Sequence, residues 1–146
     1  MPVAWRSGGH RGRNHSFQAS HHTPSLQQAV SLSAEVSDRM LAVSLTNSGA
    51  AHNFPTDERS RAADLQTRWQ NAAGNWSKWS RLHRFRDPYR DETELVNTSL
   101  PAGATWSGTL SIESLADAVE VRLLYRTNPF QSDDQAAVVH LVQIDL

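Results

Sequence analysis

Short segments in which apolar and polar residues alternate recur along most of this sequence, and this pattern limits the folds open to it. The alternation is clearest in residues 29–36, 41–45, 119–125 and 138–144. Successive side chains of a strand point to opposite faces of a sheet, so alternation over about four to eight residues predicts a half-buried β-strand. We therefore expect a protein built mainly of β-sheet.

Turn-forming residues separate these segments at the spacing of a β-sandwich. Clusters of Ser, Asp, Asn, Pro and Gly, which favour tight turns, lie at residues 37–39, 47–49, 71–75 and 100–103. Further strands are predicted within residues 63–69, 76–85 and 106–112, and a weak one near Leu95 and Val96. About seven short antiparallel strands predict an all-β, Ig/fibronectin-like sandwich. Helix is plausible only in residues 60–69 and 114–118.

The first part of the chain differs from the rest. Residues 1–28 are rich in Gly, His, Ser, Arg and Gln and show no apolar periodicity, so we predict an irregular arm there. Residues 29–146 are predicted to form one β-sandwich domain, which fits a chain of 146 residues. Five Trp, four Phe and two Tyr supply large apolar area for its core.

Several kinds of chemistry are excluded by residues that the sequence lacks. The chain has no cysteine, so disulfides, thiolate metal sites and covalent haem attachment within it are ruled out. No Gly-x-Ser-x-Gly, His-Glu-x-x-His or phosphate-loop motif occurs, and we predict a non-catalytic domain. No apolar run approaches the roughly 18 residues of a membrane span, and the first residues lack the apolar core of a secretory signal.

Charge is unevenly distributed along the chain. Residues 59–90 hold eight basic residues against two acidic ones, whereas residues 91–146 hold nine acidic residues against two basic ones. Segments of opposite charge that fold together tend to neutralise each other. We therefore predict internal pairing between the two segments first, and a charged binding patch only second.

Four segments, taken in order, carry a resemblance to a known family. Residues 15–21 are His-Ser-Phe-Gln-Ala-Ser-His, and residues 45–56 are Leu-Thr-Asn-Ser-Gly-Ala-Ala-His-Asn-Phe-Pro-Thr. Residues 100–103 are Leu-Pro-Ala-Gly, and residues 119–126 are Val-Glu-Val-Arg-Leu-Leu-Tyr-Arg. Together they resemble the C-terminal β-sandwich region of bacterial multihaem c-type cytochromes, in which a Thr-Asn-x-Gly turn precedes a Gly-His-Asn-Phe-Pro-Thr-Gly loop.

This resemblance implies a role beside haem rather than a haem site of the chain's own. It implies an accessory domain with a structural role in electron transfer, partnered by a haem-bearing segment or subunit, in the periplasm or otherwise outside the cytoplasm. The cofactor implied is haem c, with His52 as an axial ligand and His15 as a second candidate. The sequence departs from the family at Ala51 and Asp57, where glycine is usual, and it lacks the Cys-x-x-Cys-His motifs that attach haem.

The histidines also have simpler explanations. His52 could serve only to hydrogen-bond within its own loop and hold the Phe-Pro turn. In the arm, His10, His15, His21 and His22 could bind a transition metal, but their spacing matches no known ligand pattern, and a polar arm is the alternative. His83 and His140 lie within predicted strands and are interpreted as ordinary strand histidines.

Aromatic and basic residues interleave in the predicted hairpin of residues 63–85. Trp69, Trp76, Trp79 and Arg81 could form a surface that binds a protein or a carbohydrate. Such ribbons can also stack nucleic-acid bases, but the acidic C-terminal segment argues against a nucleic-acid partner. The alternative is a hairpin whose tryptophans pack on the core while its arginines are solvated.

Overall fold

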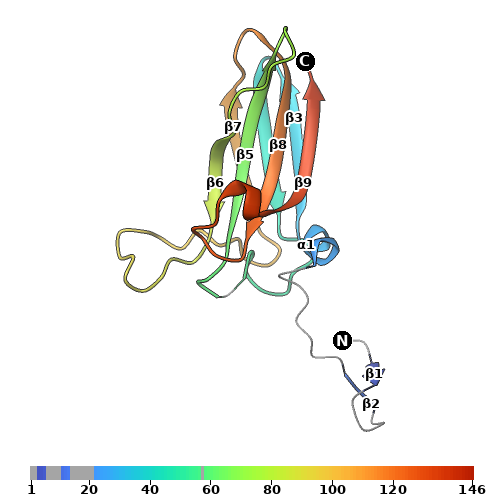
Figure 1. The fold of residues 1–146 in the computed structure, drawn as a ribbon, viewed down its shortest axis with the longest axis vertical. Helices are drawn as coiled ribbons and strands as arrows, with labels where there is room; N and C mark the ends of the chain where they lie inside the picture. Colours follow the sequence, from blue (N-terminus) through green and yellow to red (C-terminus); the bar gives the residue numbers. More distant parts are fainter. Residues whose placement is uncertain (1–2, 6–10, 14–21, 57) are drawn as a thin grey trace.

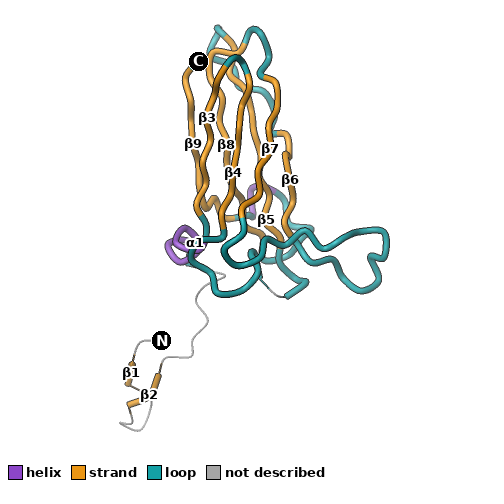
Figure 2. The backbone as a smooth tube through the Cα atoms, turned by 180° about the vertical axis from the view of Figure 1, so that it is seen from behind, coloured by secondary structure: helices purple, strands orange, loops and turns teal. Residues whose placement is uncertain are grey.

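Two β-sheets packed face to face form the body of the protein (Figures 1 and 2). The computed structural model describes residues 3–5, 11–13, 22–56 and 58–146. The predicted all-β sandwich is confirmed. Its elements are α1 (Thr23–Ala29), β3 (Ser31–Ser37), β4 (Met40–Thr46), β5 (Ala62–Asn71), β6 (Ser80–Phe85), β7 (Thr105–Ser111), β8 (Ala116–Arg126), the 3-10 helix η2 (Asp133–Gln135) and β9 (Ala137–Asp145).

The smaller sheet of the sandwich has the antiparallel order β3–β4–β7. A two-residue turn joins β3 to β4, and both of its residues, Asp38 and Arg39, have positive φ angles of 51° and 59°. Such angles are typical of type I′ hairpin turns, so the turn predicted at residues 37–39 is confirmed. The register places the fully buried Leu41 and Leu45 toward the second sheet.

The larger sheet has the antiparallel order β6–β5–β8–β9. On the inner face of its two central strands, Leu65 pairs with Leu123, and both are fully buried. On the outer face, Asp64 and Arg126 are buried as well, at 1% and 3% exposure. The central strands are therefore covered on both sides, unlike the half-buried strands that simple alternation predicts.

Asp64 on β5 is held by arginines from both neighbouring strands. Arg84 of β6 donates two hydrogen bonds to its carboxylate, at 2.7 and 2.8 Å, and Arg126 of β8 donates another at 2.7 Å. Burial alone would raise the pKa of Asp64, but the hydrogen bonds and positive charges of the two arginines outweigh it and hold the pKa below its usual value. Arg126 continues the network to Asp133.

The prediction of irregular structure throughout residues 1–28 is wrong for part of that segment. β1 (Val3–Trp5) and β2 (Arg11–Arg13) form an antiparallel pair, and α1 begins at Thr23. Only Leu26 of this seven-residue helix is buried, so the sequence shows no helical periodicity. No helix in the described ranges is long and apolar enough to cross a membrane.

Other local predictions were also wrong. No strand forms at Leu95 and Val96, whose side chains are 52% and 74% exposed in a long loop after the edge strand β6. The strand predicted within residues 63–69 is confirmed as part of β5, so the helical alternative for residues 60–69 is wrong. The helical alternative for residues 114–118 is wrong as well, because this segment lies in a turn and the start of β8. Pairing with neighbouring strands determines the secondary structure of these segments, and the local sequence does not reveal that pairing.

We predict that Asp64→Asn lowers the free energy of unfolding by about 3–5 kcal/mol, because it leaves buried guanidinium charge without its partner. The native carboxylate has a lowered pKa, so its contribution is complete above the unfolded-state pKa of about 3.9 and is lost as the pH falls through the folded-state value. Urea unfolding at neutral pH and through the acid range measures both effects.

Asp117→Asn is the matched control, since Asp117 is exposed and forms no ion pair with any residue that the structure describes. It should change stability by no more than about 0.5 kcal/mol. Equal stability of the two variants would contradict the role assigned to the Asp64 network.

Candidate functional site

Asn47 fixes the loop that carries His52. Its backbone N–H donates to the Ala104 carbonyl at 3.0 Å, and its own carbonyl accepts from the Gly103 N–H at 2.8 Å. Its side-chain amide donates to the carbonyls of His52 and Leu100, at 2.8 and 3.0 Å. Asn47 is 1% exposed, so one buried side chain ties this loop to the segment before β7.

Phe54 anchors the other end of the same loop. It exchanges two backbone hydrogen bonds of 2.8 Å with Leu100, and its buried ring lies 6.3 Å from that of Tyr125 in β8. The predicted His-Asn-Phe-Pro-Thr loop is therefore attached to the core through its phenylalanine.

The loop also packs directly on α1. The Gly49 N–H donates to the Ala29 carbonyl at 3.0 Å. A Cβ atom at position 49 would lie 2.1 Å from the backbone oxygen of Gln28, so only glycine fits this approach. The glycine of the Thr-Asn-x-Gly turn therefore has a packing role, and it brings the loop beside the helix through which the chain enters the sandwich.

His52 presents its ring to solvent from this anchored loop. The side chain is exposed, and Nδ1 lies 2.7 Å from the backbone carbonyl of Asn53. A carbonyl oxygen can only accept, so Nδ1 carries the hydrogen and the neutral ring has its lone pair on Nε2. Among the described residues Nε2 has no hydrogen-bond partner. Both explanations of His52 thus hold geometrically: it bonds within its loop, and it keeps a free ligand nitrogen.

The His52 loop shares one end of the sandwich with α1 and two other loops (Figures 1 and 2). The loop after β6 reaches furthest from the body and carries the exposed Leu95 and Val96. The loop between β8 and β9 carries Phe130, whose side chain is 71% exposed and stacks on Tyr89. This end, which we call the α1 end, therefore combines an exposed imidazole with exposed apolar side chains.

Most of the predicted metal ligands cannot be placed. His10, His15 and His21 lie outside the described residues. His22 is exposed at the start of α1, where its Nδ1 lies 2.8 Å from the hydroxyl of Ser25. Within the described ranges, no three His, Asp or Glu residues come together as a metal site would require. Metal binding by the arm stays a prediction.

The two strand histidines have structural partners. His140 lies 2.8 Å from the Val30 carbonyl, which links β9 to the end of α1. His83 stacks on Trp106 of the opposite sheet, with ring centroids 5.0 Å apart, and meets Phe85 edge-on. Burial lowers the pKa of His83, and the negative charge of Asp64 only partly opposes this.

Two of the predicted binding-surface tryptophans stack on arginines of the outer sheet face. The guanidinium of Arg68 lies 4.6 Å from the ring centroid of Trp76 and 4.5 Å from that of Trp79, and the guanidinium of Arg122 lies 3.9 Å from Trp79. Glu120 accepts a 2.6 Å hydrogen bond from Arg68. These contacts form an arginine–tryptophan cluster (Trp76, Arg68, Trp79 and Arg122). Within it, the Trp79 ring already makes cation–π contacts with two arginines.

The four predicted surface residues do not all lie on one face of the sheet. Trp69 points to the inner face of β5 and packs against the core, whereas Trp76 and Trp79 belong to the outer face. Arg81 is half-exposed, with Nη1 4.0 Å from the Asp64 carboxylate. Sequence reasoning missed Arg122, although its position opposite the inward alternation of β8 could have placed it on this face.

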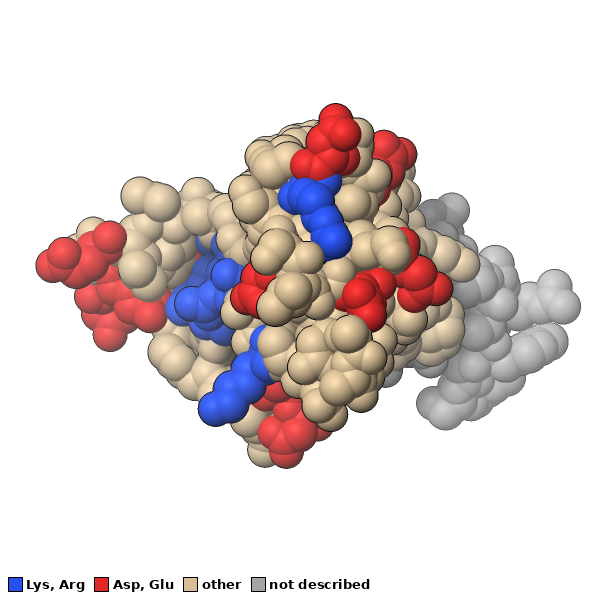
Figure 3. Space-filling model, turned by 90° about the horizontal axis from the view of Figure 1, so that it is seen from above, with Lys and Arg blue, Asp and Glu red and all other residues tan. Residues whose placement is uncertain are grey.

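The predicted pairing of basic and acidic segments is present in part. Arg68–Glu120 and Arg86–Glu92 each join the two segments. In Figure 3, which looks onto the sandwich from above, the basic and acidic side chains on that face are interspersed. The acidic group that projects furthest in this view lies at the left, where the loop after β6 extends.

The fold matches part of a known haem protein. The whole chain superposes on the crystal structure of a penta-heme cytochrome c552 from Thermochromatium tepidum with a TM-score of 0.69 and 17% sequence identity. The match covers 100% of this chain and 46% of the cytochrome, so the chain spans a little less than half of that protein's length. At this identity the likeness establishes a shared fold.

Other comparisons add little. A second solved structure, the Northeast Structural Genomics Consortium target SoR45, matches with a TM-score of only 0.36 and 11% identity over 83% of this chain and 89% of that one, which is too distant to bear on the fold. No protein-family model matches the sequence, and no curated protein matches it significantly.

We predict that Asn47→Ala lowers the free energy of unfolding by about 1–3 kcal/mol, because it leaves two backbone carbonyls at the base of the His52 loop without their donor. Hydrogen exchange should show faster opening of residues 50–54 and 100–104. Asn53→Ala is the control, since the Asn53 side chain makes no hydrogen bond in the described part of the chain. Slow exchange of these amides in Asn47→Ala would refute the anchoring role.

Proposed function

We propose that this chain is a non-catalytic accessory domain of a multihaem c-type cytochrome assembly and that its α1 end faces a haem-bearing segment or subunit. The observation that carries the proposal is the likeness of the whole chain to part of a penta-heme cytochrome, with a TM-score of 0.69. The sequence resemblance around the His-Asn-Phe-Pro-Thr loop points the same way. An association with c-type haem would place the chain in the periplasm or otherwise outside the cytoplasm.

His52 is the residue we assign to the haem. Because the chain has no cysteine, haem c would be attached to the partner and this chain would supply one axial imidazole. Hydrogen bonding of Nδ1–H to the Asn53 carbonyl leaves Nε2 as the ligand nitrogen. A backbone carbonyl is a common partner for the second nitrogen of a ligating histidine, because it orients the ring and raises its basicity. The haem of the partner would supply the one-electron transfer.

The remainder of the α1 end suits contact with a partner. Leu95, Val96 and Phe130 expose apolar side chains there, and burying them would exclude water from the haem edge. Anchoring of the His52 loop by Asn47 and Phe54 means that the imidazole is already positioned before binding, which lowers the entropic cost of ligation.

The test uses a haem peptide that carries its own proximal histidine and leaves the sixth iron position to solvent. Mixed with the chain, it should give the Soret and α-band changes of a low-spin, two-histidine haem. We predict that His52→Ala weakens this binding at least tenfold, because it removes the Nε2 ligand.

His22→Ala is the matched control, since His22 is the other exposed histidine among the described residues. It should leave the spectral titration unchanged. A titration unaffected by His52→Ala, or the absence of any low-spin spectrum at millimolar chain, would overturn the assignment of His52.

A further inference from the structure

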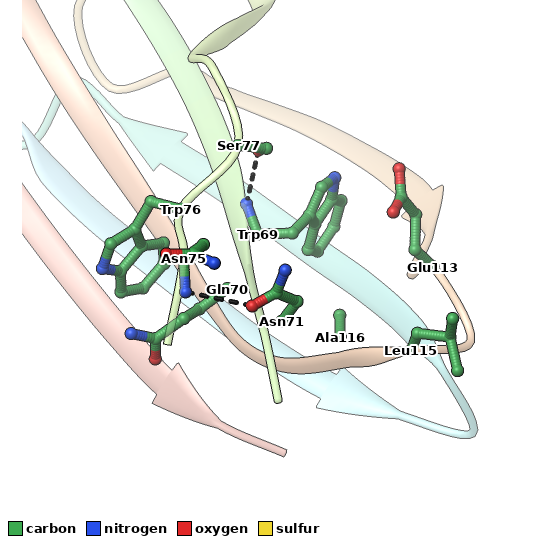
Figure 4. A pocket seen from close by; sticks show the side chains of 9 residues that line it. All are labelled: Trp69, Gln70, Asn71, Asn75, Trp76, Ser77, Glu113, Leu115 and Ala116. Atoms are coloured by element: carbon green, nitrogen blue, oxygen red, sulfur yellow. Dashed lines mark hydrogen bonds between the residues drawn. The ribbon is translucent and has the colours of Figure 1, made fainter. Parts of the chain in front are cut away.

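We propose that a hollow at the end of the sandwich remote from α1 binds a neutral saccharide of one or two rings. The hollow lies where the turn after β5 meets the turn between β7 and β8 (Figure 4). Its volume is about 340 Å³, near the lower end of the roughly 300–1,000 Å³ typical of small-molecule sites. Its lining residues are Trp69, Gln70, Asn71, Asn75, Trp76, Ser77, Glu113, Leu115 and Ala116.

The lining combines flat apolar rings with planar polar groups. In Figure 4 the Trp69 indole lies between the Asn71 amide and the Glu113 carboxylate, and Trp76 lies on the other side of Asn75. A pyranose ring has the matching properties, with an apolar C–H face that packs on an indole and hydroxyl groups that both donate and accept hydrogen bonds.

Several polar groups of the hollow remain available to a ligand. The Asn71 Oδ1 atom accepts from the N–H groups of Ala73 and Asn75, and the Gln70 Nε2 atom donates to the Gly74 carbonyl. The Asn71 Nδ2 atom, the Gln70 Oε1 atom, the Asn75 side-chain amide and the Glu113 carboxylate have no hydrogen-bond partner within the described residues. The hollow thus offers both a donor and acceptors.

The walls of the hollow are held in place before any ligand arrives. Asn71 and Asn75 are joined by a 3.0 Å backbone hydrogen bond, and Gly74 takes the positive φ of 81° that the turn requires. Across the hollow, Arg39 donates to the Ala116 carbonyl at 2.9 Å and fixes the turn that carries Glu113. Such preorganisation lowers the cost of binding a small ligand.

Charge selects among ligand classes. No Lys or Arg lines the hollow, so an anion would meet only the Glu113 carboxylate and would be repelled. A cation would be drawn to Glu113, but one face of Trp76 already carries the guanidinium of Arg68, which opposes a second positive charge there. A neutral ligand rich in hydroxyl groups avoids both penalties.

The experiment is a titration of the chain with neutral mono- and disaccharides that cover gluco, galacto, manno and N-acetylhexosamine rings in α and β linkage. We expect at least one probe to shift the NMR signals of residues 69–77 and 113–116 together, including the indole N–H groups of Trp69 and Trp76. Glu113→Ala and Asn75→Ala change exposed side chains and should each weaken binding about tenfold, since a hydrogen bond to the ligand is lost.

Ser114→Ala, in the same turn but outside the lining, is the control and should bind as the native chain does. Absence of shifts with every saccharide at millimolar concentration would overturn the proposal, as would binding that Glu113→Ala and Asn75→Ala leave unchanged. Tetramethylammonium is titrated in parallel, and shifts of these residues by this cation but by no saccharide would overturn the ligand class. His52 lies at the opposite end of the sandwich, so this outcome is independent of the haem test.

Discussion

The central strands β5 and β8 bury apolar side chains on their inner face and charged side chains on their outer face. The rest of the sandwich depends on how these buried charges are neutralised. Asp64 takes guanidinium groups from both neighbouring strands, and Glu120 takes that of Arg68. A buried ion pair gains little over a well-packed apolar pair, but losing one partner is costly. A shift of one residue in the β5–β8 register would turn Asp64 into the core. The network therefore opposes the wrong register more than it adds to the stability of the right one.

The central strands are covered on both faces, and the two candidate sites lie at the ends of the sandwich. At one end Asn47 joins three separate backbone segments and leaves the His52 ring outside. At the other, the Asn71–Asn75 turn and the Glu113 turn enclose a hollow. Each loop is held by hydrogen bonds, which are buried or partly buried around Asn47 and mostly exposed in the Asn71–Asn75 turn. Loops held in this way on rigid sheets keep functional groups in fixed positions.

Sequence alternation was a good guide where one face of a strand is buried and a poor one elsewhere. It identified β3, β4 and β8 from their apolar positions, but it gave no sign that Asp64 would be buried in β5. Helix α1 escaped detection because a single leucine, Leu26, anchors it. The apolar pair Leu95 and Val96 indicated a strand, yet both side chains are exposed. His52 was identified through its motif, whereas the contact of Arg122 with Trp79 joins residues far apart in the sequence and required the three-dimensional structure.

In the proposed assembly, the strength of the His52–iron bond is coupled to the docking of the α1 end. A single exposed imidazole competes with water and with every other free histidine for an open iron position. Burial of Leu95 and Val96 against the haem-bearing partner would hold His52 at a high effective concentration beside the iron, and the bond would in turn hold the interface closed. The anchoring hydrogen bonds of Asn47 matter for the same reason, because a loop that opened freely would lose this gain. The domain would thus act on the haem through geometry, with the His52 ring already oriented by the Asn53 carbonyl.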